Sequence, residues 1–358
     1  MSNFQITPYY ENLLDSLGSN HPLCRTVFPL NDRTPAPREL ADPLGEENHS
    51  PCPGLIHTYP DKVLLLATLD CAVHCQYCTR GRLVGTHPRL ASLADPSQGG
   101  GSNQMPSEVS SSGGVPDLSA EALAKEEGRG GFSKPWKKQD EKFQWLEKHQ
   151  EVRDVLVSGG DPLMLSDDEL DQLLGRVRQV RHVRTVRLGS KVPAVMPERI
   201  TPELAKLLAK HRIWLQLHFI HPDELTTEVR TACDTLAEAG VPMVSQTVLL
   251  KGINDDADTL ADLFYGLLEN RVKPYYLFQC DPVLGSSSFR TPVQKGLDLM
   301  RELQGRVSGL ALPNFCIDAP GGGGKITLQP DTVLCRDGTD VLLTNYAGKE
   351  YRYPDPQA

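Results

Sequence analysis

The sequence predicts an α/β protein whose main domain is a partial or irregular TIM-like barrel, with an N-terminal extension and a small C-terminal β cap. Short apolar strand segments alternate with amphipathic helices along most of the 358 residues. Such alternation is typical of right-handed strand–helix–strand units in a parallel sheet. Seven strands can be counted. A complete barrel has eight, so the count favours incomplete closure.

Residues 1–60 are rich in proline and acidic side chains and are interpreted as an extension over the main domain, with a helix at residues 8–17. The main domain is assigned to residues 61–320. Its strands are expected at residues 62–69, 154–160, 185–190, 213–219, 242–250, 272–280 and 313–318. Helices are expected at residues 166–180, from 201, at 225–239, after 254 and at 292–304. Ser166 and Glu169 have capping-box spacing at the first of these helices.

Two further segments depart from the alternating pattern. Residues 92–132 contain glycine- and serine-rich runs with almost no aromatic or branched side chains, so they are predicted to form a disordered surface insertion. Residues 321–358 begin with a glycine loop and continue as short strand-like runs, which predict the small C-terminal cap.

Composition limits the classes of function. With 39% hydrophobic and 23% charged residues the chain is typical of globular proteins, and its net charge of −9 argues against nucleic-acid or membrane-surface binding. No apolar run approaches the roughly 20 residues that span a bilayer. Residues 1–12 lack the basic and apolar regions of a secretory signal, so a cytoplasmic protein is expected.

Three of the nine cysteines are clustered directly after the first barrel strand, in the run CAVHCQYC at Cys71, Cys75 and Cys78. Three thiolates on one loop can hold three irons of a 4Fe–4S cluster and leave the fourth iron open. A zinc site would need a fourth protein ligand, and His74 lies inside the short loop, where its geometry would be poor. The scattered cysteines are interpreted as small buried hydrophobes; they are Cys24, Cys52, Cys233, Cys280, Cys316 and Cys335.

Two glycine-rich stretches follow strands. Gly159 and Gly160, followed by Asp161, end the second strand, where a backbone without side chains can approach a ligand. Four glycines at residues 321–324 precede Lys325, and amides in such a loop can reach an anion. The spacing is not that of a Walker A loop. A lysine on a mobile loop suits an imine with pyridoxal phosphate, although composition alone is equally consistent with a surface turn.

Ten segments together resemble the lysine 2,3-aminomutase family, which combines radical S-adenosylmethionine (SAM) chemistry with pyridoxal phosphate. They are ITPYY, SPCPGLIHTYPDKVLLL, CQYCTRGR, DVLVSGGDPLMLSDDEL, RITPEL, HFIHPDE, QTVLLKGIND, KPYYLFQCD, FRTPVQKG and DAPGGGGKI. The resemblance covers nearly the whole chain outside residues 92–132 and the C-terminus. It implies a radical SAM type of barrel.

The resemblance also implies residue roles. The cluster ligands would be Cys71, Cys75 and Cys78, and the SAM contacts would be Gly159, Gly160 and Asp161. Lys325 would form the imine, and the matching pyridoxal phosphate contacts are Tyr59, Lys62 and Gln246. His218 is interpreted as a contact near the SAM adenine or as a structural histidine. Arg80 matches the residue that receives the substrate carboxylate.

Asp281 and Asp318 match the two carboxylates that receive the distal ammonium of lysine. A buried carboxylate pair needs a cation, which favours lysine over glutamate and leaves arginine open. The implied reaction interconverts L-lysine and β-lysine by radical 1,2-amino migration. It uses a 5′-deoxyadenosyl radical from SAM and a pyridoxal phosphate imine. The implied partners are a free basic amino acid and an electron donor such as flavodoxin or ferredoxin; a homo-oligomer is open.

Departures and alternatives accompany this hypothesis. Thr58 stands where relatives have an arginine for the cofactor phosphate. Asp256 stands where some relatives have a zinc cysteine, so no zinc is expected. Two alternatives keep the chemistry and direct it to arginine or another amino acid, or to a lysine destined for elongation factor P. A different class is a non-catalytic iron–sulfur redox protein.

Overall fold

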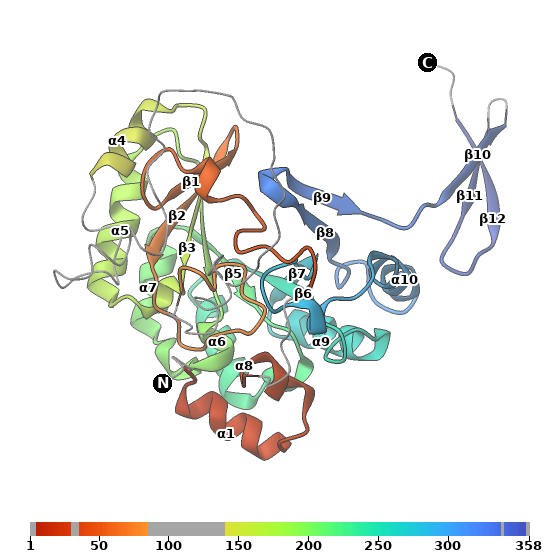
Figure 1. Cartoon of the computed structure of the whole chain (residues 1–358), viewed down its shortest axis with the longest axis horizontal. Helices are drawn as coiled ribbons and strands as arrows, with labels where there is room; N and C mark the ends of the chain where they lie inside the picture. The colour runs from red at the N-terminus through yellow and green to blue at the C-terminus, as the bar shows by residue number, and fades with distance from the viewer. Residues whose placement is uncertain (1–4, 30–35, 85–139, 338–339, 356–358) are drawn as a thin grey trace, which may run out of the picture.

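A nine-stranded sheet forms the centre of the protein, with its strands in the order β1 to β9 (Figure 1). The structure is a computed structural model that describes residues 5–29, 36–84, 140–337 and 340–355. The predicted insertion at residues 92–132 lies outside these described residues. Within the described residues, no helix combines the length and apolar character needed to cross a membrane.

All seven predicted barrel strands are present and parallel. They are β2 (Lys62–Thr68), β3 (Asp154–Gly159), β4 (Thr185–Ser190), β5 (Ile213–His218), β6 (Met243–Leu249), β7 (Val272–Gln279) and β8 (Asn314–Ala319). The sequence predicted these strands from their apolar runs, because both faces of a parallel sheet are covered and its strands are apolar on both sides.

Two edge strands extend this sheet beyond the prediction. β1 (Leu55–Tyr59) pairs antiparallel with β2, and β9 (Gly324–Leu328) pairs antiparallel with β8. Among the described residues no ladder joins β1 to β9, so the sheet is an incomplete barrel, as the strand count predicted. The end of the predicted N-terminal extension and part of the predicted glycine loop therefore belong to the sheet.

Helices cover the outside of the sheet (Figure 1). They are α1 (Pro8–Leu17), α4 (Glu141–Lys148), α5 (Asp167–Gln179), α6 (Val192–Val195), α7 (Pro202–Lys210), α8 (Thr227–Glu238), α9 (Ala257–Glu269) and α10 (Val293–Leu303). The capping box of Ser166 and Glu169 is confirmed at the start of α5. Short 3₁₀ turns join these elements; they are η1 (Pro22–Thr26), η2 (Glu47–His49), η4 (Pro162–Met164), η5 (Pro197–Arg199), η6 (Pro222–Glu224), η7 (Ser287–Phe289) and η8 (Pro320–Gly322).

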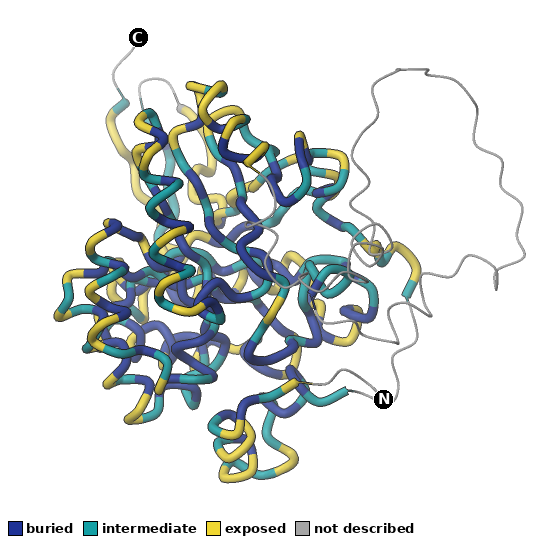
Figure 2. Tube along the Cα trace, turned by 90° about the vertical axis from the view of Figure 1, so that its left-hand side faces the viewer, coloured by how far each residue is buried: buried dark blue, intermediate teal, exposed yellow. Residues whose placement is uncertain are grey.

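The hydrophobic core lies between the sheet and these helices (Figure 2). On α5 the fully buried side chains follow the helical repeat and face the strands, as Leu170, Leu173, Leu174 and Val177. The core continues into the N-terminal extension, where Tyr10 and Leu14 of α1 are buried. The extension is thus packed against the barrel.

The short C-terminal strands that the sequence predicts are present. β10 (Val333–Asp337), β11 (Asp340–Thr344) and β12 (Glu350–Pro354) form a separate antiparallel sheet. Figure 1 shows this sheet standing away from the barrel at the end of β9. Every residue of β12 is exposed, whereas the turn between β11 and β12 reaches the main domain, where the Tyr346 ring lies against Gly305. Strand propensity predicts that a segment is extended, and it carries no information on where the segment docks.

Candidate active site

The cysteine loop follows β2 and is held by the N-terminal extension. Gln76 N donates to Thr26 O at 2.8 Å, and His74 N donates to Gln5 O at 3.1 Å. Cys71, Cys75 and Cys78 are free, partly exposed thiols on this loop. The extension therefore shapes the loop that carries the predicted cluster ligands.

The thiols of this loop resist ionisation in the absence of a cation. Burial raises the pKa of all three, that of Cys75 to about 11. The pKa of Cys71 is raised further by the neighbouring Cys78 and Cys75. A cation bound by all three sulfurs would remove this mutual repulsion, so the donor set fits an iron–sulfur cluster.

The two glycines after β3 pack directly against the cysteine loop. Gly160 N donates to Thr68 O at 2.6 Å, and Asp161 N donates to Asp70 O at 2.7 Å. A Cβ atom on Gly160 would lie 2.2 Å from Asp70 O, and one on Gly159 would lie 2.4 Å from Thr68 O. Their sequence context predicts a close approach to a ligand, whereas their geometry shows a contact between two backbone segments.

The Asp161 carboxylate is occupied by donors from the protein. It accepts hydrogen bonds from Ser190 Oγ at 2.8 Å, Lys191 N at 2.7 Å, and the amides of Leu163 and Val192, each at 3.1 Å. Burial raises its pKa, and these hydrogen bonds oppose that effect. Asp161 therefore ties the end of β3 to the end of β4, a positioning role that its sequence context did not reveal.

Gly160→Ala is expected to loosen the cysteine loop, because the added methyl group would collide with Asp70 O. The expected cost is about 1–3 kcal/mol of folding free energy, with lower iron content after reconstitution. Thermal unfolding and iron analysis measure both effects. Gly309→Ala is the matched control, since a Cβ atom there would meet no described neighbour within 4 Å. Equal iron content and melting temperature in both variants would contradict the bracing role.

His218 is held through both ring nitrogens. Its Nδ1 donates to Gln246 O at 2.9 Å, and its Nε2 accepts from Tyr77 Oη at 2.7 Å. Burial, followed by the nearby Lys191 ammonium, lowers the pKa of His218 to about 4. The imidazole is neutral and braces Tyr77 of the cysteine loop, which favours the structural alternative for this residue.

A buried ion pair that the sequence did not reveal lies beside the cysteine loop. The Glu224 side chain is fully buried, and its Oε1 contacts Lys191 Nζ at 2.6 Å and accepts from Tyr10 Oη at 2.9 Å. The Lys191 charge lowers the pKa of Cys75 against the effect of burial. Glu224 lies in the HPDE run, where an acidic residue after proline is ordinary, so no local signal distinguished it.

Lys325 lies on β9 directly opposite Asp318 on β8. Its Nζ contacts Asp318 Oδ1 at 2.9 Å, and its backbone N donates to Tyr59 Oη at 2.6 Å. Tyr59 belongs to β1, so this hydrogen bond joins the two edge strands of the open sheet. The expectation that Lys325 lies on a mobile glycine loop is wrong, because β9 begins at Gly324 and the lysine is in a paired strand.

Asp281 completes an acidic cluster with Asp318. Burial raises the pKa of Asp281 to about 7, repulsion from Asp318 adds to this, and Lys325 opposes it. The structure therefore brings Asp281, from the end of β7, to Asp318 and Lys325, which face each other across the β8–β9 hairpin.

Lys62 and Gln246, the other two residues predicted to contact pyridoxal phosphate, both contact other residues of the protein. Lys62 Nζ pairs with Asp61 Oδ1 at 3.0 Å and lies 4.7 Å from the centre of the Tyr59 ring. Gln246 lies on β6, and its carbonyl is the acceptor for His218. Lys62 is thus paired with Tyr59 across the β1–β2 hairpin, and its ammonium contacts Asp61.

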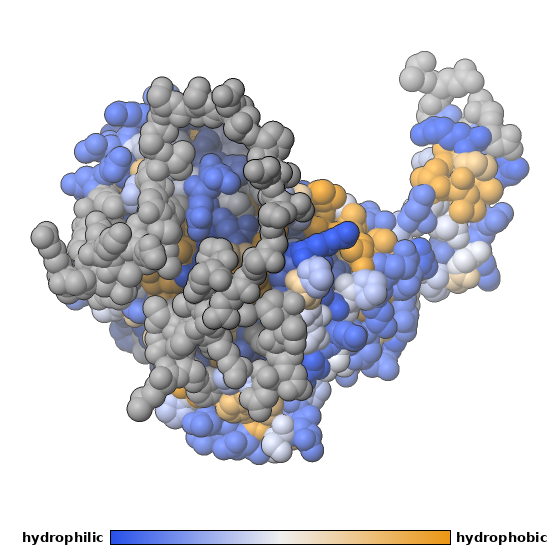
Figure 3. All heavy atoms as spheres, in the orientation of Figure 1, coloured by the Kyte–Doolittle hydropathy of each residue, from blue (hydrophilic) through white to orange (hydrophobic). Residues whose placement is uncertain are grey.

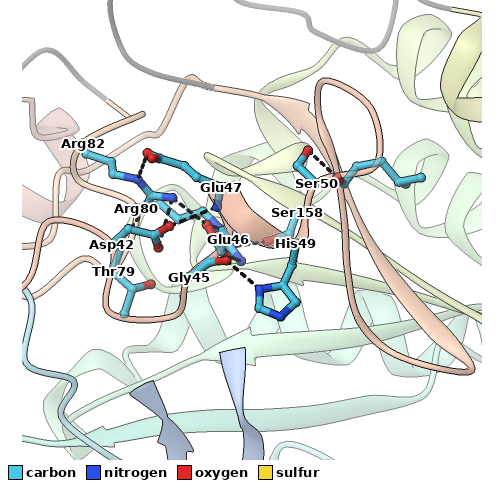
Figure 4. Close-up of polar contacts among 11 residues, drawn as sticks. Asp42, Gly45, Glu46, Glu47, His49, Ser50, Thr79, Arg80, Arg82 and Ser158 are labelled. Atoms are coloured by element: carbon cyan, nitrogen blue, oxygen red, sulfur yellow. Dashed lines mark hydrogen bonds and ion pairs between the residues drawn. The ribbon is translucent and has the colours of Figure 1, made fainter. Parts of the chain in front are cut away.

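Arg80 is paired with a residue that the sequence did not single out. Its Nε and Nη2 donate to Glu46 Oε1 at 2.9 and 2.6 Å, and its Nη1 donates to Ser158 Oγ at 3.3 Å (Figure 4). The Glu46 side chain is only 5% exposed. Arg82 pairs with Asp42 and Glu47 in the same cluster. Glu46 thus fixes one edge of the Arg80 guanidinium.

The segment around Glu46 also contacts the glycine turn before Lys325. Gly321 N donates to Pro43 O at 2.9 Å. A Cβ atom on Gly45 would lie 2.8 Å from the carbonyl carbon of Gly321, so glycine is required for this approach. In Figure 3, the part of this view that no grey atoms cover is mostly hydrophilic, with smaller hydrophobic patches. The N-terminal extension therefore links Arg80 to the turn that presents Lys325.

The chain is similar to several known proteins. Residues 65–264 match the radical SAM superfamily, and residues 300–358 match a family described as lysine-2,3-aminomutase. L-lysine 2,3-aminomutase of Fusobacterium nucleatum subsp. nucleatum is 39% identical over 98% of this chain and 73% of that protein. Glutamate 2,3-aminomutase of Clostridioides difficile is 36% identical over 99% of this chain and 74% of that protein. The solved structure of a radical SAM methyltransferase from Sphaerobacter thermophilus matches with a TM-score of 0.43 and 16% identity, over 74% of this chain and 68% of that chain.

Proposed function

Because this chain belongs to the lysine 2,3-aminomutase family of radical SAM enzymes, we propose that it is an isomerase that interconverts L-lysine and β-lysine. The observation that carries the choice of substrate is the partly buried pair of Asp281 and Asp318 beside Lys325. The two carboxylates can carry two negative charges, and Lys325 balances one of them. The side chain of a basic amino acid supplies a second positive charge. A glutamate side chain would add a third negative charge.

A 4Fe–4S cluster and SAM belong to the radical SAM class. We propose Cys71, Cys75 and Cys78 as the cluster ligands. Held there, a reduced cluster with SAM would supply a carbon radical able to remove a hydrogen atom from the substrate. The loop contributes by holding its three sulfurs in fixed positions, which Gly160 and Asp161 support through their hydrogen bonds to residues 68 and 70. An electron donor such as flavodoxin or ferredoxin is required to reduce the cluster.

Pyridoxal phosphate is proposed as the further cofactor, held by Lys325, Tyr59, Lys62 and Gln246. The convergence of Tyr59 and Lys325 from opposite edges of the sheet supports this proposal, as do the glycines next to the lysine. When bound, the cofactor would supply a reversible covalent link to the migrating amine and could delocalise an unpaired electron. Asp318 holds the Lys325 ammonium at 2.9 Å and so orients the side chain before that link is exchanged.

The acidic pair also predicts how substrate binding depends on protons. A pKa of about 7 means that Asp281 carries a proton below neutral pH, when no second cation is present. The distal ammonium of lysine, with an ordinary pKa of about 10.4, would take the place of that proton. Asp281 and Asp318 then receive the substrate cation, while Arg80 receives the carboxylate at the other end.

The KM for lysine is therefore expected to fall as pH rises towards 7 and to level off above it, because only ionised Asp281 attracts the cation. Below the pKa of Asp281 the change approaches about tenfold per pH unit. Steady-state kinetics between about pH 6 and 8 measure this slope. Asp281→Asn should raise KM and remove the slope. A wild-type KM that does not vary over this range would contradict the role of Asp281.

Glu46→Gln is expected to raise the KM for lysine about tenfold with a smaller change in kcat, because Arg80 loses the charged partner that fixes its orientation. The kinetics of the purified variant measure the split between KM and kcat. Glu47→Gln is the matched control: its carboxylate pairs with Arg82 and is 44% exposed. Equal KM values for the two variants would show that Glu46 does not position Arg80 for the substrate.

The experiment that tests the proposed function uses anaerobic protein reconstituted with iron, sulfide and pyridoxal phosphate. SAM, a reductant and either lysine, arginine or glutamate are added, and chiral chromatography with mass detection identifies any β-amino acid. β-Lysine alone supports the proposal. β-Arginine would keep the chemistry and change the substrate, whereas SAM cleavage without any β-amino acid would exclude the aminomutase activity. An iron–sulfur redox protein would yield no product and show no pyridoxal absorbance.

A further inference from the structure

Two histidines and an aspartate from distant parts of the chain meet outside the active site. His21 precedes η1 in the N-terminal extension, and His221 and Asp223 lie at η6, after β5. One ligand atom from each side chain lies within 4.8 Å of the other two. The same region joins α1 to the start of α8, where Tyr9 Oη and Thr226 Oγ1 are 2.6 Å apart (Figure 1). The three side chains therefore stand at the junction of extension and barrel.

The distances suit the coordination of one small metal ion. His221 Nδ1 lies 3.3 Å from Asp223 Oδ2, and His21 Nε2 lies 2.9 Å from the same oxygen. Tetrahedral zinc with bonds of about 2.0–2.1 Å separates its ligand atoms by about 3.3–3.4 Å. The first distance matches, and the second is shorter and also suits a hydrogen bond. The two imidazole rings meet edge to face, with centroids 5.1 Å apart.

Hydrogen bonding alone leaves one of these contacts unfavourable. His221 Nδ1 accepts from Asp223 N at 3.3 Å, so in that tautomer it carries no hydrogen. The same nitrogen faces Asp223 Oδ2, and two acceptors that face each other repel. A cation between the nitrogen and the oxygen would replace this repulsion with two coordination bonds.

We propose that His21, His221 and Asp223 bind a divalent zinc ion that fastens the N-terminal extension to the barrel. Two imidazoles and one carboxylate favour zinc over magnesium or calcium, which prefer oxygen ligands. Asp256, the N-cap of α9, adds negative charge close to His221. If His21 bound the ion through Nε2, its ring hydrogen would lie on Nδ1. Nδ1 could then no longer accept the hydrogen bond from Leu23 N, but that bond is weak at 3.4 Å.

The proposed ion would lie where it can stabilise the contact between the N-terminal extension and the barrel. Glu224 directly follows Asp223, is fully buried, and binds both Lys191 and Tyr10 of α1. An ion at Asp223 would hold the η6 turn and η1 together. Thr26 of η1 accepts the hydrogen bond from Gln76 N, so the ion would also support the cysteine loop. The expected role is to stabilise the extension on which the cluster loop rests.

Zinc binding is tested on full-length protein whose cluster has first been reconstituted with iron, so that the three loop thiols are occupied. After removal of loose metal with a chelator, the protein is titrated with Zn²⁺, and bound zinc and melting temperature are measured. The wild type should bind one equivalent and gain about 3–6 °C. Co²⁺ should bind at the same site without the intense near-ultraviolet band of a cobalt–thiolate bond.

His21→Ala and the isosteric Asp223→Asn should weaken zinc binding by about 100-fold or more and remove the rise in melting temperature. His211→Ala is the matched control, because His211 Nε2 contacts Asp171 Oδ1 at 2.6 Å in a pair without a second histidine. Circular dichroism verifies that each variant is folded. No zinc in the wild type, or equal zinc in all variants, would overturn the proposal. If His21→Ala does not fold, Asp223→Asn decides.

Discussion

Lys325→Ala is expected to abolish formation of β-lysine, with a loss of about 10⁴-fold or more, because the amine that links to the aldehyde cofactor is removed. The side chain is placed for this role by Asp318 at 2.9 Å and by the backbone hydrogen bond to Tyr59. The variant should also lack the absorbance of the lysine-bound cofactor. Anaerobic activity assays and visible spectra of the reconstituted protein measure the two effects.

The Lys325→Arg variant distinguishes the loss of the covalent link to the cofactor from the loss of the positive charge. Arginine keeps a cation next to Asp318, so the ion pair is retained, but its guanidinium does not form the same link to an aldehyde. Both variants should therefore be inactive, with Lys325→Arg closer to the wild type in melting temperature. More than about a tenth of wild-type activity in either variant would remove Lys325 from the proposed mechanism.

Replacing Cys71, Cys75 or Cys78 singly with alanine is expected to end SAM cleavage as well as β-lysine formation. Two thiolates and an open position hold a 4Fe–4S cluster poorly, so iron should fall from about four atoms per chain towards background. Burial already disfavours the ionised thiols, and the remaining pair would keep that penalty with less metal to offset it. Iron and sulfide analysis, with detection of 5′-deoxyadenosine, measures the change.

Cys335→Ser is the control for this series, because Cys335 is exposed on the separate C-terminal sheet. It should retain the iron content and activity of the wild type. A loop variant that kept both its iron and its SAM cleavage would refute the assignment of that cysteine. Loss of iron in the loop variants together with an unchanged pyridoxal spectrum would show that the two cofactors occupy independent sites.

Much of the fold was predictable because its signals are local. The apolar run from Lys62 to Thr68 is long enough for a strand and too short for a helix, and it forms β2. Ser166 and Glu169 satisfy each other's backbone groups at the start of α5 without help from distant residues. The cysteine spacing is likewise complete within eight residues, from Cys71 to Cys78.

The sequence was wrong or uninformative where a partner elsewhere in the chain determines the structure. Lys325 was expected on a loop, because the glycines before it favour a turn, yet pairing with β8 extends it as β9. The glycines at 159 and 160 carry no sign of what they approach until β2 and the cysteine loop are placed beside them. Glu46 looked like one acid among several, and only the fold brings it to Arg80.

By itself, the sequence determined the alternating strand–helix order, the three-cysteine loop and the similarity to lysine 2,3-aminomutases, because each of these is written in short contiguous segments. Only the tertiary structure decided the partners of Arg80, the role of the Asp161 carboxylate and the meeting of Tyr59 with Lys325. Ion pairs and edge pairing depend on distances between segments that lie far apart in the chain. Local propensity carries no information about those distances until the chain has folded.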